Sequence, residues 1–320
     1  MIFSGIVTNT YRDCIRQPLY FIVMVFTISF IGLFPLLSFF VFNEQIKMVL
    51  DSSMASILLF SMVLSVLLAG GSIYKDISSG NISLILSKPI SRNIFLAGRV
   101  LGVMLAVTQF VLVSSLSAVI SAYIAVDQFN LDYKIFYSFY LLIFVGCFTG
   151  FLMNYFFRKS FSGNSVLGIT FLVLFQVICL IVKNPNFLSE NGLTLQNMTS
   201  LAVLILFAVW IMVNISMAIS TRFDLVVNLI LCFVLLVLGL LSDYLVSGYA
   251  ANGSVVFSII YAILPNWQFF WLVDAVTNGK NIPLSYIGYS LIYALLYITV
   301  CFSIAVISFG SIEAAKANKD

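Results

Sequence analysis

Residues 200–221 read SLAVLILFAVWIMVNISMAIST, and none of these twenty-two side chains carries a charge. A hydrocarbon core about 30 Å thick needs about 20 predominantly apolar residues in a helix. As a helix, the stretch satisfies its own backbone hydrogen bonds in lipid. A transmembrane β-strand would instead show about ten residues of alternating hydrophobicity, which this stretch does not. The sequence therefore predicts a transmembrane helix here.

Seven further runs of the 320-residue chain share this apolar character. Only 8% of the residues are charged and 62% are hydrophobic, whereas a soluble domain carries roughly 25% charged residues. A soluble fold of this composition would expose large apolar surfaces and aggregate. We therefore predict an all-α polytopic membrane protein with about eight transmembrane helices. The predicted spans are 19–42, 54–73, 100–126, 135–157, 165–182, 200–221, 225–245 and 284–311.

The distribution of Lys and Arg predicts the orientation, because cytoplasmic connections carry an excess of these residues. With the N-terminus inside, eleven of the fifteen Lys and Arg residues fall in cytoplasmic segments and four in outer segments. The eleven are Arg12, Arg16, Lys75, Lys88, Arg92, Arg99, Arg158, Lys159, Arg222, Lys316 and Lys319. We expect both termini to be cytoplasmic, in a multi-pass protein of the plasma (cytoplasmic or inner) membrane.

Residues 1–18 precede the first predicted span and have a pattern of their own. Their apolar residues recur at three- and four-residue spacing, with polar residues on the other face, which predicts an amphipathic helix lying in the inner interface. The run at 19–42 is longer than the apolar region of about 7–15 residues in a removable signal peptide. The expected organisation is this interfacial helix, a transmembrane domain over 19–312 and a cytoplasmic tail over 313–320.

Two connections are longer than the others. The inner connection 75–92 carries an apolar stripe that suits a cytoplasmic partner, and Ser91 is placed to cap a helix that starts near Arg92. The outer segment 249–283 contains an apolar run too short to span, which predicts re-entrant or interfacial short helices. The Trp-rich stretch 266–276 within it indicates either anchoring at headgroup level or a lid that contacts substrate.

The sequence argues against catalysis in this chain. It contains no histidine and no Gly-x-x-x-x-Gly-Lys-Ser/Thr loop, which excludes His-based acid–base chemistry and ATP hydrolysis by that route. The five cysteines are far apart and predict neither a disulfide framework nor a metal site. Asp243 is the one charged residue inside a predicted span, and it indicates either a solvated helix end or an ion-coupling carboxylate. We expect no catalytic residue, metal or resident cofactor.

Uncharged polar residues and glycine pairs within the spans are the remaining candidates for function or packing. Each amide below either bonds a neighbouring helix or lines a substrate path. The four amide residues are Gln109, Gln176, Asn214 and Asn228. Two Gly-x-x-x-Gly pairs would allow close approach between helices, a motif that is frequent by chance in such spans. These pairs are Gly98 with Gly102 and Gly146 with Gly150.

Residues 74–102, YKDISSGNISLILSKPISRNIFLAGRVLG, resemble the connection between the second and third spans of type 2 ABC export permeases. That family shows an acidic residue, Ser-Gly-Thr, a Leu-rich stretch, Pro-x-Ser-Arg and then Gly-Lys. The matching positions are Asp76, Ser79, Gly80, Leu84, Leu86, Pro89, Ser91, Arg92 and Gly98. The chain departs from the pattern at Asn81 in place of Thr and at Arg99 in place of Lys, and its eight spans exceed the usual six. The specific likeness covers about residues 1–105.

The resemblance implies that this chain is the permease subunit of an ATP-driven exporter. Two permease chains, identical or different, would pair in the membrane and bind a dimer of cytoplasmic ATPases, which would hold ATP and Mg²⁺. The connection 75–92 would act as the coupling helix seated on the ATPase. The residues implied in coupling are Asp76, Ile77, Gly80, Leu84, Ile85, Pro89, Ser91 and Arg92. The implied cargo is lipid-like, peptide or polysaccharide-linked, and no nucleic-acid partner is expected.

Two other classes of function stay open at this point. A self-sufficient secondary carrier or channel would transport without nucleotide and would depend on Asp243. A non-transporting membrane scaffold or an intramembrane enzyme is the third class, and its enzyme form lacks histidine and a buried pair of acids.

Overall fold

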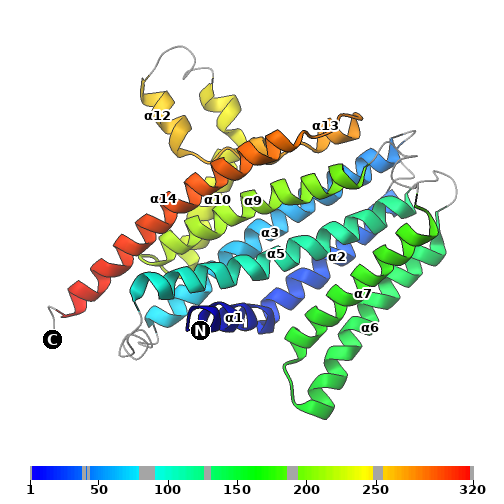
Figure 1. The fold of residues 1–320 in the computed structure, drawn as a ribbon, viewed down its shortest axis with the longest axis horizontal. Helices are drawn as coiled ribbons and strands as arrows, with labels where there is room; N and C mark the ends of the chain where they lie inside the picture. Colours follow the sequence, from blue (N-terminus) through cyan, green and yellow to red (C-terminus); the bar gives the residue numbers. More distant parts are fainter. Residues whose placement is uncertain are drawn as a thin grey trace.

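The computed structural model in Figure 1 describes residues 2–37, 41, 44–78, 91–125, 131–185, 194–247 and 255–317. Every regular element in this part of the chain is a helix. Within it, eight helices are long and apolar enough to cross a membrane, which confirms the predicted all-helical chain with eight candidate spans. These helices are α2 (Pro18–Leu37), α3 (Gln45–Ser78), α5 (Arg92–Ile124), α6 (Tyr133–Phe157), α7 (Phe161–Lys183), α9 (Leu195–Ser220), α10 (Leu225–Ser242) and α14 (Leu284–Ala317).

The helices extend beyond the apolar runs that predict them. Helix α3 begins at Gln45 and α5 at Arg92, whereas the apolar runs begin at 54 and 100. Polar residues such as Lys47 and Asp51 do not interrupt a helix, so its ends follow backbone hydrogen bonding rather than the edge of the hydrophobic pattern. The apolar pattern therefore locates a span but underestimates its helix.

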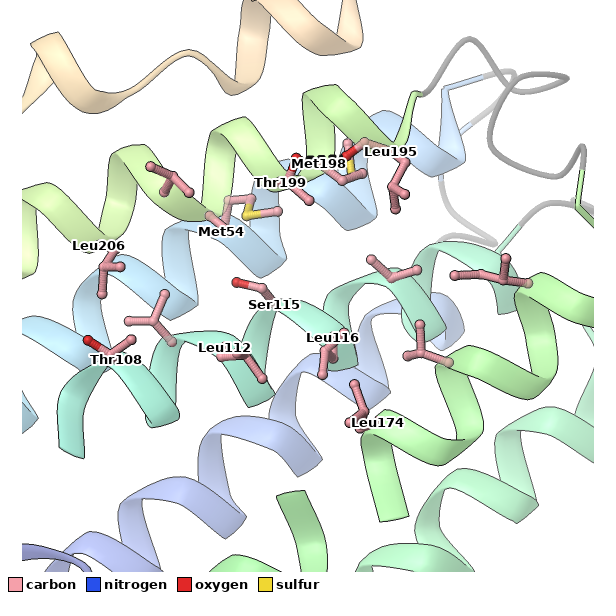
Figure 2. Close-up of a pocket in the computed structure, with 16 residues that line it drawn as sticks. Met54, Thr108, Leu112, Ser115, Leu116, Leu174, Leu195, Met198, Thr199 and Leu206 are labelled. Carbon is pink, nitrogen blue, oxygen red and sulfur yellow. Dashed lines mark hydrogen bonds between the residues drawn. The ribbon is translucent and has the colours of Figure 1, made fainter. Parts of the chain in front are cut away.

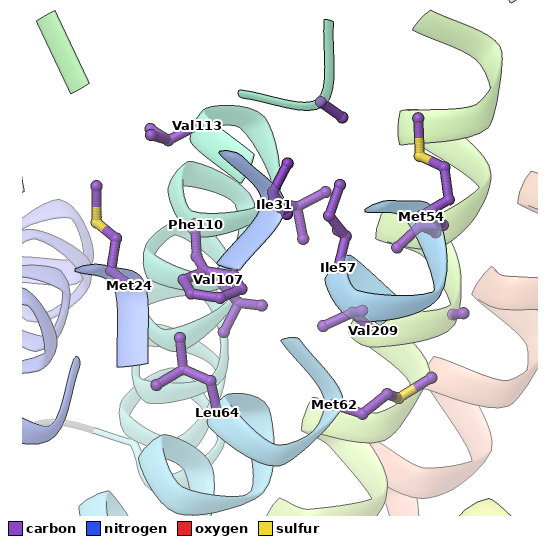
Figure 3. Close-up of a cluster of buried hydrophobic side chains, with 14 of the residues drawn as sticks. Met24, Ile31, Met54, Ile57, Met62, Leu64, Val107, Phe110, Val113 and Val209 are labelled. Carbon is purple, nitrogen blue, oxygen red and sulfur yellow. The ribbon is translucent and has the colours of Figure 1, made fainter. Parts of the chain in front are cut away.

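Consecutive spans run in opposite directions, and Figure 1 shows the two termini at the same end of the bundle. Helices α3, α5 and α9 pack against one another at the centre, while α6 and α7 form a hairpin that leans on α5 and α2. Figure 3 shows the buried core where α2, α3, α5 and α9 meet. Its labelled side chains include Met24, Ile31, Ile57, Leu64, Phe110 and Val209, all buried.

The outer helices leave their apolar faces uncovered by the chain. In α9, 67% of the most apolar window is buried, against 22% in α10 and 17% in α14. Exposed apolar side chains along α14 include Ile292, Leu296 and Ile307. Such faces are stable when lipid or another membrane helix covers them, in keeping with a multi-pass membrane protein.

Helix α1 (Ile2–Arg16) lies across the start of α5. A Cβ at Gly98 would come within 2.6 Å of Ile6 Cγ2, and one at Gly102 within 2.5 Å of Thr10 Cβ. The first Gly-x-x-x-Gly pair thus lies where α1 and α5 approach most closely within one chain. The predicted N-terminal helix is confirmed, while its position in a membrane interface stays a prediction.

Short helices connect α10 to α14. They are η2 (Asp243–Ser247), α12 (Val255–Ile263), η3 (Gln268–Phe270) and α13 (Val273–Thr277). The segments Phe257–Ile263 and Gln268–Thr277 are apolar enough to cross only when taken together, across a bend of 49°. Trp267 is buried and donates its indole N–H to Leu235 O at 3.3 Å, so this indole packs within the protein. Gly239 leaves the space, because a Cβ there would collide with the indole. The position of the Trp-rich stretch at headgroup level stays a prediction.

Candidate functional site

An apolar cavity of about 340 Å³ lies between α5, α7 and α9 (Figure 2). Helix α5 supplies residues at three- and four-residue spacing, so one stripe of the helix forms a wall of the cavity. Leu112, Leu174 and Leu195 on its rim are exposed, so the cavity opens to the surface of the bundle. The lining residues are Met54, Thr108, Val111, Leu112, Ser115, Leu116, Val119, Leu174, Val177, Ile181, Leu195, Met198, Thr199, Ala202, Val203 and Leu206.

None of these lining residues is charged, and the polar atoms among them are three hydroxyls and backbone groups. Thr108 Oγ1 donates to Met104 O at 2.7 Å and accepts from Trp210 Nε1 at 3.1 Å. Thr199 Oγ1 donates to backbone carbonyls of its own helix. Ser115 Oγ is buried and has no hydrogen-bond partner among the described residues. Figure 2 shows the Ser115 hydroxyl between α5 and α9.

The cavity is suited to an apolar group with one polar atom. An apolar cavity of about 150 Å³ stays free of water and takes up a molecule such as benzene. A cavity of about 340 Å³ has room for a larger apolar group. The free Ser115 hydroxyl would bond one polar atom of that group, because an unpaired buried hydroxyl is costly to leave.

The four amide residues predicted to line a substrate path lie outside this cavity. Two of them, Gln109 and Gln176, form hydrogen bonds to side chains of the hairpin. Gln109 of α5 accepts from Tyr11 Oη at 2.5 Å and donates to Thr170 Oγ1 at 2.9 Å, which ties α1, α5 and α7 together. Gln176 of α7 donates to Ser138 Oγ of α6 at 3.0 Å. Neither side chain is among the lining residues of this cavity.

The two asparagines are buried in the central bundle. Asn214 donates to Trp210 O at 2.9 Å within α9. Asn228 of α10 donates to Ser216 Oγ of α9 at 2.9 Å, and Gly70 of α3 lies so close that a Cβ there would collide with the amide. Asn228 thus joins α10 to α9, whereas the Asn214 bond to Trp210 lies within α9, and both amides are absent from the cavity lining.

The second Gly-x-x-x-Gly pair lies where α6 meets α7. A Cβ at Gly146 would lie 2.5 Å from Ile169 Cγ1, and one at Gly150 would lie 2.8 Å from Phe161 O. Both glycine pairs thus permit close helix packing within this chain, and Gly146 with Gly150 sets the distance between the two helices of the hairpin.

The residues implied in ATPase coupling divide into two groups. Asp76 and Ile77 belong to the last turn of α3, and Arg92 is the first residue of α5. Ser91 occupies the N-cap position of α5, but its side chain makes no hydrogen bond to the first turn, so its predicted capping bond is wrong. Its backbone is extended, at φ −67° and ψ 140°, and the predicted start of the helix near Arg92 is confirmed. Gly80, Leu84, Ile85 and Pro89 lie outside the described residues.

Asp243 lies in η2, at the end of α10, and is held by hydrogen bonds. Tyr261 Oη donates to its Oδ1 at 2.6 Å, and Asn266 Nδ2 donates to the same oxygen at 2.9 Å. Asp243 is half-buried at the end of α10, and these bonds fasten α10 to α12 and to the chain before η3. The carboxylate does not line the apolar cavity.

The described part of the chain offers little support for metal binding or for thiol chemistry at Cys14. No group of three or more Cys, Asp or Glu side chains is placed there to hold a metal ion. Burial raises the pKa of the Cys14 thiol to about 12, so it stays a neutral thiol at neutral pH.

Comparison with protein-family models matches none of them, and comparison with curated proteins finds no match.

Proposed function

We propose that this chain is the membrane-spanning permease subunit of an ATP-driven exporter of the ABC type, and that an apolar or amphipathic substrate occupies the cavity between α5, α7 and α9. The observation that carries the proposal is the path from the connection between α3 and α5 to the apolar cavity. Residues 79–90 join α3 to α5, and α5 supplies six of the sixteen lining residues. A force on that connection acts on the helix that forms the cavity wall.

The lengths of α3 and α5 support this path. They contain 34 and 33 residues and measure about 50 Å at 1.5 Å per residue, against a hydrocarbon core of about 30 Å. Helix α1 crosses α5 at Gly98 and Gly102, one to three turns from its start. If α1 lies in the interface, the start of α5 and the connection reach beyond the lipid to a soluble ATPase.

The absence of charge in the cavity lining supports an external energy source. Ion-coupled carriers place ionisable groups along their path, because the coupling ion needs a charged partner. Asp243 is bonded to Tyr261 and Asn266 instead, and no residue of the cavity is ionisable. The sequence also contains no phosphate-binding loop. Both observations favour ATP hydrolysis in partner subunits, with a second permease chain completing the membrane part.

A co-purification experiment tests the proposal. The chain is purified in mild detergent, intact and with Gly80→Asp plus Leu84→Asp in the connection, and the co-purified proteins are identified by mass spectrometry. The matched control, Gly192→Asp plus Leu188→Asp, places the same two residue types at the same spacing in a predicted outer connection. We expect a P-loop ATPase in about equal amount with the intact chain and the control, and none with the connection variant.

Two results would overturn the proposal. One is the absence of an ATPase from the intact chain in every mild detergent tested. The other is nucleotide-independent transport by the purified chain in vesicles that is abolished by Asp243→Asn, which would favour the secondary carrier.

A further inference from the structure

A second cavity, of about 540 Å³, lies where α1 meets the turn between α6 and α7. Four of its nine lining residues are cationic and none is acidic: Arg12, Arg16, Arg158 and Lys159. The remaining lining residues are Ile15, Ser160, Gly163, Asn164 and Leu167. The cluster therefore combines two segments that are more than 140 residues apart in the sequence.

Local structure brings these charges together. Arg12 and Arg16 are four residues apart and share the exposed face of α1. Gly163 in the first turn of α7 allows Arg16 to approach, because a Cβ there would lie 3.2 Å from Arg16 Cγ. Arg158 and Lys159 form the turn that follows α6. Arg16 thus lies against the first turn of α7, and all four cationic residues line the same cavity.

The backbone at Arg158 is unusual for an arginine. It adopts the left-handed conformation, with φ 53° and ψ 30°, and is the only non-glycine residue with positive φ in the described part of the chain. Its N–H bonds Asn154 O at 3.1 Å and the N–H of Lys159 bonds Met153 O at 3.2 Å, as in a helix end that normally carries Gly or Asn. An arginine in this strained position suggests that its charge has a use there.

These four cations have no carboxylate partner within 4 Å among the described residues. Asp13, the nearest acid in sequence, turns to Arg99 instead, with Asp13 Oδ2 3.9 Å from Arg99 Nη1. Ser160 occupies the N-cap position of α7 but makes no side-chain bond to the first turn, which leaves backbone N–H groups of that turn for another acceptor. Lys159 Nζ also lies over the Phe157 ring, 5.9 Å from its centroid. Four cations without a carboxylate partner and a helix N-terminus around one cavity favour a polyanionic group.

We propose that this cavity, which we call the cationic cavity, binds the phosphate of an anionic phospholipid headgroup. It lies at the ends of membrane-length helices, where basic pockets between helices bind such headgroups. Leu167 in its lining and Phe161, next to Ser160, are exposed on α7 and offer an apolar surface to the acyl chains. Arg from α1 and basic residues from the hairpin would hold the same phosphate, so the lipid would join α1 to α7. The inference does not depend on the proposed export activity.

Native mass spectrometry of the full chain in detergent tests the proposal. Phosphatidylglycerol and phosphatidylcholine are titrated separately, with inorganic phosphate as a competitor. The variant Arg16→Gln plus Arg158→Asn removes two charges, and Asn suits the left-handed turn, so the turn is preserved. Lys134→Gln plus Lys183→Gln removes two charges at the other end of α6 and α7 as a control. We expect phosphatidylglycerol to bind in preference to phosphatidylcholine. The first variant should weaken that binding about 25-fold, at about fivefold for each charge, and the control should leave it unchanged.

Several results would overturn the proposal. Equal binding of the two lipids would show that the headgroup charge is not recognised. An equal loss in the control variant would show a general charge effect. Binding of inorganic phosphate without binding of phosphatidylglycerol would assign the site to a soluble anion. If the double variant elutes as an aggregate, Lys159→Gln replaces it, with an expected loss of about fivefold.

Discussion

The apolar cavity and the cationic cavity share helix α7 but differ in chemistry. The second half of α7 supplies Leu174, Val177 and Ile181 to a cavity without charge, and its N-cap and first turn supply Ser160, Gly163 and Asn164 to a cavity with four cations. Charge is expensive in the hydrocarbon region and cheap near the headgroups, where lipid phosphates are available. The difference indicates that the position of a cavity along the spans determines the kind of ligand that it accepts.

The largest expected effect comes from placing the same negative charge in each cavity. Ser115→Asp puts a carboxylate among apolar side chains and should lower the free energy of unfolding by about 3 kcal/mol. Ser160→Asp puts it beside Arg16, Arg158 and Lys159 at a helix N-terminus and should raise that free energy by about 1 kcal/mol. Denaturant titration in mixed micelles measures both.

The uncharged variants Ser115→Asn and Ser160→Asn are the controls for this comparison. Each keeps nearly the shape of the aspartate, so the difference between Asp and Asn at one position isolates the charge. Equal losses for the two aspartate variants would contradict the contrast between the cavities.

A smaller effect is expected from separating the two helices of the hairpin. Gly146→Leu forces a side chain against Ile169 and should lower the free energy of unfolding by about 2 kcal/mol, because overpacking displaces neighbours. The same change should weaken ligand binding in the apolar cavity, since α7 forms one of its walls. Gly288→Leu is the matched control, because nothing lies within 4 Å of a Cβ at that position. A loss at Gly288 as large as that at Gly146 would contradict the packing argument.

Much of the fold could be predicted from the sequence, because each span satisfies its own hydrogen bonds and carries a local apolar signal. Helix α9 is the clearest case, since residues 200–221 predict it unaided. The start of α3 could not be predicted in this way, because the helical backbone continues through polar residues such as Lys47. The start of α5 at Arg92 was predicted from the position of Ser91 rather than from the apolar run. The burial of Trp267 could not be predicted either, because it depends on the space left on α10 by Gly239, which has no side chain.

The two cavities show which features of a binding site cannot be predicted from the residue pattern of the sequence. Thr108 and Ser115 are seven residues apart and therefore share a face of α5, which is a signal that could have indicated the apolar cavity. The polar amides of Gln109 and Gln176 are the more obvious candidates for lining a substrate path, yet they form hydrogen bonds to neighbouring helices. Arg12 and Arg16 share a face by spacing alone, but their meeting with Arg158 depends on how α1 packs on the hairpin.

The smallest expected effect distinguishes a hydroxyl kept for a ligand from one used in the fold. Ser115 Oγ has no partner among the described residues, whereas Ser117 Oγ on the same helix donates to Val113 O at 2.9 Å. Ser115→Ala should therefore leave the free energy of unfolding unchanged or raise it by about 1 kcal/mol, and Ser117→Ala should lower it by about 1 kcal/mol. An apolar probe that carries one carbonyl group should bind the Ser115→Ala variant about fivefold more weakly than the parent, while its hydrocarbon analogue should bind both equally, as measured by fluorescence titration. A Ser115→Ala variant that is less stable by 1 kcal/mol or more, with unchanged probe binding, would show that the hydroxyl serves the fold, and the apolar cavity would then lose its one polar recognition point.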